Sequence, residues 1–142
     1  MAQAREKTEM VVIHCSATKP SMDIGADTIR KWHVEGNGWS DIGYHKVIKR
    51  NGAVENGRPL MAMGAHVKGK NAISIGICMV GGSDVDGKAE DNFTEAQWGS
   101  LRVVCSEMRR IFPGVTFHGH NEFANKACPS FDVQSWATKE LF

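Results

Sequence analysis

The sequence predicts an α/β fold: a single domain with a mixed central β-sheet flanked by helices. Two continuous apolar runs, residues 10–14 (MVVIH) and 74–80 (SIGICMV), are too short for helices and are typical of strands buried on both faces. A long amphipathic pattern follows Thr94, which forms a capping box with Gln97, and predicts a helix that lies on such a sheet. The chain has 142 residues, of which 42% are hydrophobic, so a single core can hold it.

The first helix is expected over residues 28–35, ahead of a glycine-containing segment. Asp27 is its expected N-cap, and Gly36 or Gly38 is its expected stop. The remaining elements follow from shorter patterns: strands at 44–49, 53–55 and 115–118, and a closing helix at 132–141. An Asn-Gly pair at positions 51 and 52 joins the first two of these strands and is the strongest local signal of a hairpin.

Composition and charge exclude several classes of function. Seventeen basic and sixteen acidic residues give a net charge of +1, which indicates no direct binding to nucleic acid and no attraction to an anionic membrane. No apolar run is long enough to span a bilayer, and the polar N-terminus (MAQAREKTEM) lacks the features of a signal peptide. We therefore expect a flexible polar arm at residues 1–8 and one domain at residues 9–142, in a monomer in the cytoplasm of the producing cell.

The four cysteines have no close paired spacing, so free thiols are expected rather than disulfides. Cys78 and Cys105 lie within apolar patterns and are expected to be buried core thiols. Cys128 differs, because it lies in a loop-like segment (KACPSF) with a proline directly after it.

Histidines at the ends of predicted strands indicate a metal site. His14 ends one predicted strand, and His118 and His120 lie near the end of another. Cys128 follows eight residues after His120. Side chains at strand ends reach a cleft while the backbone stays rigid. These residues could supply two imidazoles and one thiolate, and three protein ligands with an open fourth position are the arrangement of catalytic zinc. The opposing interpretation makes His14 a satisfied core histidine and Cys128 a packed thiol, and spacing alone leaves both open. His33, in an amphipathic helix, is expected at the surface or in packing rather than as a ligand.

Nucleobase deaminases have a second zinc pattern that the chain matches in part. His120, Asn121 and Glu122 fit the H-x-E element of those enzymes, whose second element is P-C-x-x-C. Here the proline follows Cys128 and no second cysteine comes after it, so the deaminase interpretation fails on the number of ligands.

Five segments in one order resemble the type 2 N-acetylmuramoyl-L-alanine amidases. The segments are VVIHCSATKPS (11–21), GWSDIGYHKVIKRNG (38–52), GAHVKGKNAISIGICMVGG (64–82), FTEAQWGSLR (93–102) and HNEFANKACPSFD (120–132). They cover nearly the whole chain and are most similar to the amidase lysozymes, or endolysins, of short-tailed coliphages; animal peptidoglycan recognition proteins share the domain. One departure is an extra residue in the segment EGNGW (35–39), a predicted surface loop.

The resemblance implies a site for one Zn²⁺ per chain, in a surface cleft at the strand ends. Carried over by position, it makes His14, His120 and Cys128 the zinc ligands and gives His118 a non-ligand position. The choice between the two neighbouring histidines therefore comes from the family and not from spacing.

The resemblance also implies the catalytic and substrate-binding residues. Tyr44, the only tyrosine in the chain, and Lys126 take the catalytic positions, and His66 takes a position in the substrate cleft. Without the resemblance, Tyr44 reads as a residue of an amphipathic strand and Lys126 as a solvated loop cation.

The implied reaction is hydrolysis of the lactyl amide bond between muramic acid and L-alanine in bacterial peptidoglycan, by a phage endolysin. An enzyme without a signal peptide would reach the wall through a membrane pore or after lysis. The resemblance also implies a second role as inhibitor of a phage RNA polymerase. The alternative is a non-catalytic peptidoglycan-binding module, and the presence of Cys128 favours the enzyme, because non-catalytic recognition proteins characteristically lack that ligand.

Overall fold

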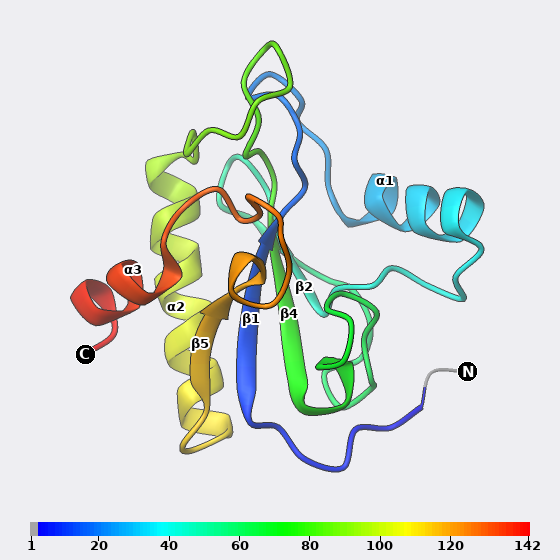
Figure 1. The fold of residues 1–142 in the computed structure, drawn as a ribbon, viewed down its shortest axis with the longest axis vertical. Helices are drawn as coiled ribbons and strands as arrows, with labels where there is room; N and C mark the ends of the chain where they lie inside the picture. Colours follow the sequence, from blue (N-terminus) through cyan, green and yellow to red (C-terminus); the bar gives the residue numbers. More distant parts are fainter. Residues whose placement is uncertain (1–2) are drawn as a thin grey trace.

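The centre of the fold is a mixed sheet, as the sequence predicts (Figure 1). The computed structural model describes residues 3–142, and in that range the sheet has five strands in the order β3-β2-β4-β1-β5. Their bounds are β1 Met10–Cys15, β2 Lys46–Ile48, β3 Val54–Asn56, β4 Ser74–Met79 and β5 Thr116–Gly119. Strand β4 is parallel to β1 and β2, β1 is parallel to β5, and β3 is antiparallel to β2. The carboxyl ends of the parallel strands therefore meet at one edge of the sheet.

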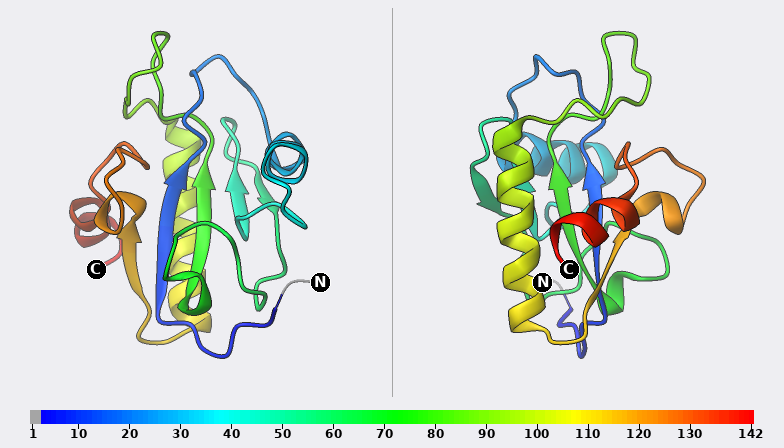
Figure 2. Two further views of the ribbon diagram at one scale, coloured as in Figure 1. Left: turned by 45° about the vertical axis from the view of Figure 1, so that its right-hand side comes forward. Right: turned by 90° about the vertical axis from the view of Figure 1, so that its left-hand side faces the viewer.

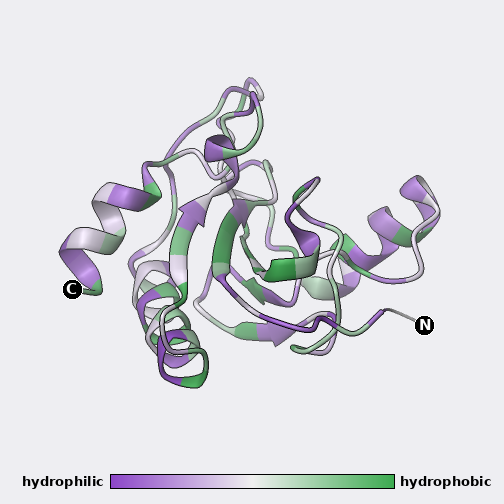
Figure 3. Cartoon of the chain, turned by 60° about the horizontal axis from the view of Figure 1, so that its bottom comes forward, coloured by the Kyte–Doolittle hydropathy of each residue, from purple (hydrophilic) through white to green (hydrophobic). Residues whose placement is uncertain are grey.

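The two strands predicted from continuous apolar runs are the central ones. Every residue of β4 is buried, and so is every residue of β1 after Met10. Figure 3 shows the hydrophobic colouring along these strands. The short edge strand β3 is joined to β2 by the predicted turn, in which Gly52 has a φ of +88° and Asn51 Oδ1 accepts the N–H of Ala53. The fold class and the hairpin are confirmed.

Helices cover both faces of the sheet (Figure 2). Helix α2, Glu95–Ile111, packs on the face formed by residues such as Ile13, Ile75 and Ile77, and its Thr94–Gln97 capping box is present as predicted. Helix α1, Ala26–Lys31, packs on the opposite face, and α3, Val133–Glu140, lies beside β5. None of the helices in residues 3–142 combines the length and apolarity that crossing a membrane requires.

The start of α1 corrects the expected cap. The helix begins at Ala26, and its N-cap is Gly25 rather than Asp27, which lies in the first turn. The free N–H of Ala26 donates to Oε1 of Glu55, 29 positions away on β3, at 2.8 Å. A tertiary carboxylate thus replaces the local cap, and a local pattern does not reveal it. After Lys31 the chain continues as a π-helix, Trp32–Gly36, which the 3.6-residue period does not predict.

The described part of the expected N-terminal arm is attached to the domain at Arg5. The Arg5 side chain is 3% exposed, and its backbone N–H donates to the carbonyl of Met61 at 2.8 Å. Its guanidinium donates to the carbonyl of Ala62 and to Thr8 Oγ1, both at 2.9 Å. Residues 1–2 of the arm lie outside the described residues, and the mobility of the segment stays a prediction.

Gln97 joins α2 to the sheet through a fully buried carboxamide. Its Oε1 accepts from the N–H of Thr94 and from the guanidinium of Arg50, at 3.0 and 3.1 Å. Its Nε2 donates to the carbonyls of Ile48 and Val80, at 3.1 and 2.8 Å. All four hydrogen-bonding positions of the amide are therefore satisfied.

Gln97→Met should destabilise the fold by about 2 kcal/mol or more, because it removes all four buried hydrogen bonds of the carboxamide, and the carbonyls of Ile48 and Val80 then keep only one other donor each. Urea unfolding measures the loss. The matched control is Val103→Met at a position of the same helix that is 63% exposed, where a change within about 0.5 kcal/mol is expected. Equal stability of the two variants would contradict this account of Gln97.

Candidate active site

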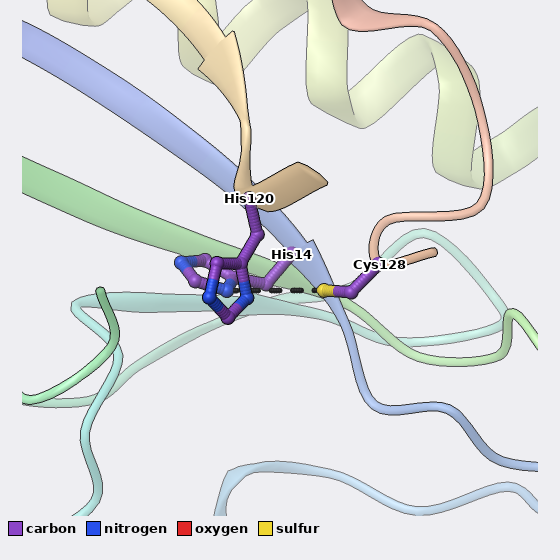
Figure 4. A group of neighbouring side chains, drawn as sticks. All are labelled: His14, His120 and Cys128. Carbon is purple, nitrogen blue, oxygen red and sulfur yellow. Dashed lines mark hydrogen bonds between the residues drawn. The ribbon is translucent and has the colours of Figure 1, made fainter. Parts of the chain in front are cut away.

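Three predicted ligands come together where the parallel strands end (Figure 4). His14 lies near the end of β1, His120 directly follows β5, and Cys128 lies in the loop before α3. One ligand atom from each lies within 4.8 Å of the other two, and Cys128 Sγ is 3.9 Å from His14 Nδ1. Two imidazoles and one thiol fit the zinc donor set, with three protein ligands and room for a fourth from solvent or substrate. The cluster is therefore one that could hold a metal ion.

The neighbouring His118 does not take part in this cluster. Its Nδ1 lies 2.9 Å from Glu122 Oε1 and its Nε2 lies 2.7 Å from Thr116 Oγ1. The chain turns into a 3₁₀-helix at His120, and this turn brings the His120 ring to 4.6 Å from the His14 ring, measured between centroids.

A cleft of about 550 Å³ opens beside the cluster. Five predicted site residues line it: His14, Tyr44, His66, His120 and Lys126. His33, which was expected at the surface or in packing, lines it too, and the other lining residues were not singled out from the sequence: Trp39, Ala65, Val67, Lys68, Asn71, Phe123 and Ala124. The lining residues include two lysines and no acidic side chain.

His33 is both a packing residue, as predicted, and part of the cleft wall. It lies in the π-helix, where its ring is 4.8 Å from that of Trp39 and 5.5 Å from that of Tyr44. Its Nδ1 accepts the N–H of Gly43 at 2.9 Å. Because His33 lies in a π-helix, the 3.6-residue period does not describe this segment and does not place the residue in the cleft.

Burial keeps the side chains of the cluster and its surroundings neutral. Desolvation, followed by the nearby His66 and His120, lowers the pKa of His14 well below its ordinary value. Desolvation and then Lys126 lower the pKa of His120. Burial, and after it the nearby cysteine side chains, raise the pKa of Tyr44 well above its ordinary value, so the phenol stays protonated and can donate a hydrogen bond.

Burial and a neighbouring thiol disfavour the ionised form of Cys128. Hydrogen bonding with the Cys15 thiol and burial raise the pKa of the Cys128 thiol, although the backbone N–H of Cys15 donates to its sulfur at 3.2 Å. A cation held by the cluster would favour the thiolate, so metal binding here is coupled to the release of a proton.

His45 is a buried histidine next to the cleft wall. It is 1% exposed, its Nδ1 accepts the N–H of Gly76, and its Nε2 donates to the carbonyl of Ala62. The pKa of His45 is lowered to about 4, mainly by burial. The hydrogen bond to the Ala62 carbonyl raises the pKa in part, and the positive charges of Arg5, Arg58 and Lys46 lower it.

Stability should therefore fall as the pH drops from 6.5, the ordinary pKa, towards 4. In this window the unfolded chain binds a proton at His45 that the folded chain does not, so the free energy of unfolding rises with pH. At about 1.4 kcal/mol per pKa unit, protonation linked to His45 lowers the free energy of unfolding by about 3 kcal/mol across this window. Urea unfolding at a series of pH values measures the slope, and the His45→Gln variant should show a shallower slope than the wild type. An equal slope in the two proteins would show that His45 does not contribute to this pH dependence.

The fold and the cluster together define a class: single-domain α/β proteins with a histidine–cysteine site at the ends of parallel strands. The model of the N-acetylmuramoyl-L-alanine amidase family matches residues 4–131. The endolysin of Escherichia phage T7 is 51% identical over 135 residues, which are 95% of this chain and 89% of the relative. The peptidoglycan-recognition protein SC2 of Drosophila melanogaster is 32% identical, over 84% of this chain and 64% of the relative.

Among solved structures, the N-acetylmuramoyl-L-alanine amidase LysC from Clostridium intestinale URNW superimposes with a TM-score of 0.80 at 26% identity, over 93% of this chain and 84% of that one. The chain belongs to the N-acetylmuramoyl-L-alanine amidase family. It is a peptidoglycan amidase, and the fold, the enzyme class and the family resemblance predicted from the sequence are confirmed.

Proposed function

We propose that the chain is a zinc-dependent endolysin that hydrolyses the lactyl amide bond between muramic acid and L-alanine. The observation that carries the proposal is the His14–His120–Cys128 cluster, which opens on a cleft that Tyr44 and Lys126 also line. A zinc ion held there would act as a Lewis acid that polarises the amide carbonyl and activates water near neutral pH.

The residues of this chain bind and stabilise the reacting amide. His14 and His120 are held neutral by burial and so keep a lone pair for the metal. The neutral phenol of Tyr44 and the ammonium group of Lys126 would donate hydrogen bonds to the carbonyl oxygen as negative charge develops on it. Donors positioned in this way are worth most in a cleft that excludes water.

The charge of the cleft suits the stem peptide of peptidoglycan, which carries free carboxylates. Lys68 and Lys126 both line the cleft, and none of the lining residues is acidic. The presence of Cys128 supports the enzyme over a non-catalytic binding module, because the donor set is complete. Action on the cell wall of a host bacterium, after release through a membrane pore or after lysis, agrees with the endolysin names of the relatives.

Mass analysis of purified peptidoglycan after digestion tests the reaction. Free stem peptides that begin with L-alanine are expected. Newly formed reducing sugar ends would instead indicate a glycosidase and overturn the proposal.

Metal removal should abolish the activity reversibly. We expect one zinc per chain by elemental analysis, loss of activity after dialysis against a chelator, and recovery when zinc is added back. Because the ligands must be deprotonated, the affinity for zinc should also fall as the pH falls. A fully active preparation that contains no metal would exclude this mechanism.

Two further expectations stay predictions. A pull-down against the cognate phage RNA polymerase tests the inhibitory role, and size-exclusion chromatography with light scattering tests the monomer.

A further inference from the structure

The His66 ring lies in a slot built for it beside the cluster. A Cβ added at Gly76 would lie 2.6 Å from His66 Cγ, and one added at Gly64 would lie 2.8 Å from His66 Cδ2. The absence of a side chain at these two positions makes room for the ring. Since His66 is only 9% exposed, the ring is fixed in orientation by packing.

A chain of three hydrogen bonds runs from the cluster through this ring. His14 Nε2 lies 2.9 Å from His66 Nδ1, and His66 Nε2 lies 3.2 Å from Ser74 Oγ. The Ser74 hydroxyl in turn donates to the carbonyl of Lys70 at 2.7 Å. Ser74 is fully buried and His14 is 1% exposed, so solvent does not replace these partners.

The last bond of this chain determines the position of every proton in it. A carbonyl can only accept, so the single hydroxyl proton of Ser74 points to Lys70, and Ser74 Oγ accepts from Nε2–H of His66. A neutral His66 then has a lone pair on Nδ1, which accepts from Nε2–H of His14. The reverse assignment would leave the Ser74 oxygen and the carbonyl of Lys70 facing each other at 2.7 Å without a proton.

His14 Nδ1 therefore carries no proton, and this nitrogen faces the cluster. His14 Nδ1 is directed at Cys128 Sγ, 3.9 Å away (Figure 4). We propose that His66 and Ser74 are positioning residues that set the tautomer and the ring orientation of His14, so that Nδ1 presents its lone pair to the metal. This inference rests on the proposed zinc site, and it gives His66 a role other than the substrate contact expected from the sequence.

Outer hydrogen-bond partners of this kind matter for affinity. A ligating histidine usually donates its second N–H to a fixed acceptor, and loss of that acceptor costs roughly 10- to 100-fold in metal affinity. Here the acceptor is another neutral imidazole, whose tautomer is fixed by a serine and a backbone carbonyl.

Nitrogen NMR of the zinc-loaded full chain, labelled with ¹⁵N at histidine, tests the proton positions directly. Protons are expected on Nε2 of both His14 and His66, with His66 Nδ1 unprotonated and accepting from His14. A proton on His66 Nδ1, or ligation of zinc through His14 Nε2, would overturn the inference.

A pair of variants tests the effect on the metal. His66→Asn keeps a carboxamide oxygen near the position of Nδ1, whereas His66→Phe fills the slot without an acceptor. In competition with a chromophoric chelator, the phenylalanine variant should bind zinc roughly 10- to 100-fold more weakly than the wild type, and the asparagine variant should recover most of that loss. His118→Asn, outside the cluster, is the matched control and should keep the wild-type affinity.

The outcomes separate this inference from the proposed function. A wild-type chain that binds no zinc would overturn both. Tight zinc binding by the wild type and by both His66 variants would overturn the role of His66 alone and leave the zinc site standing. If the His66 variants fail to fold, the NMR measurement on the wild type still decides.

Discussion

Cys128→Ser should lose zinc and amidase activity together. Two imidazoles remain in this variant, and a serine hydroxyl does not ionise near neutral pH to replace the thiolate. The loss of affinity should exceed the roughly 10- to 100-fold that removal of an outer hydrogen-bond partner costs, because a direct ligand is removed. Elemental analysis after gel filtration and a turbidity assay on cell walls measure the two effects.

Cys15→Ala is the matched control for Cys128→Ser. Cys15 is 5% exposed, and both its backbone N–H and its thiol contact the Cys128 thiol, but Cys15 is not one of the cluster residues. The control should keep one zinc per chain. Full zinc content and activity in Cys128→Ser would remove Cys128 from the proposed ligand set.

Much of the fold could be predicted because its strongest elements are encoded locally. Strands β1 and β4 are buried on both faces and therefore read as continuous apolar runs. Helix α2 carries both its apolar stripe and its capping box within its own sequence. The start of α1 could not be predicted in the same way, because Glu55 contacts it across 29 positions.

The candidate site shows the same division. His14 and Cys128 could be selected by residue type and position, but the choice of His120 over His118 needed the family resemblance. In the structure, the chain turns into a 3₁₀-helix directly after β5, and this turn brings His120 rather than His118 to the cluster. The sequence spacing of the two histidines does not reveal such a turn. Ser74 read only as part of a buried strand, because its contact with His66 is tertiary.

Tyr44→Phe and Lys126→Met should each lower kcat roughly 100- to 1000-fold while the chain keeps one zinc. The ring centroids of Tyr44 and His14 are 5.1 Å apart. A phenylalanine ring can keep this packing, so only the hydroxyl donor is lost. Lys126 is an exposed residue of the cleft wall, so its replacement should leave the fold intact. Lys139→Met, on α3 and outside the cleft, is the control for removal of a lysine charge.

Measuring kcat and zinc content separately distinguishes donors to the oxyanion from a contact with a substrate carboxylate and from a structural part of the metal site. A donor to the developing oxyanion acts in the transition state, so its loss lowers kcat and kcat/KM together. Lys126→Arg keeps a charged donor and should recover part of the rate if charge is what matters. An unchanged kcat with a raised KM in Lys126→Met would place this lysine at a carboxylate of the stem peptide rather than at the reacting oxygen. Loss of zinc in Tyr44→Phe would make the phenol a structural part of the metal site.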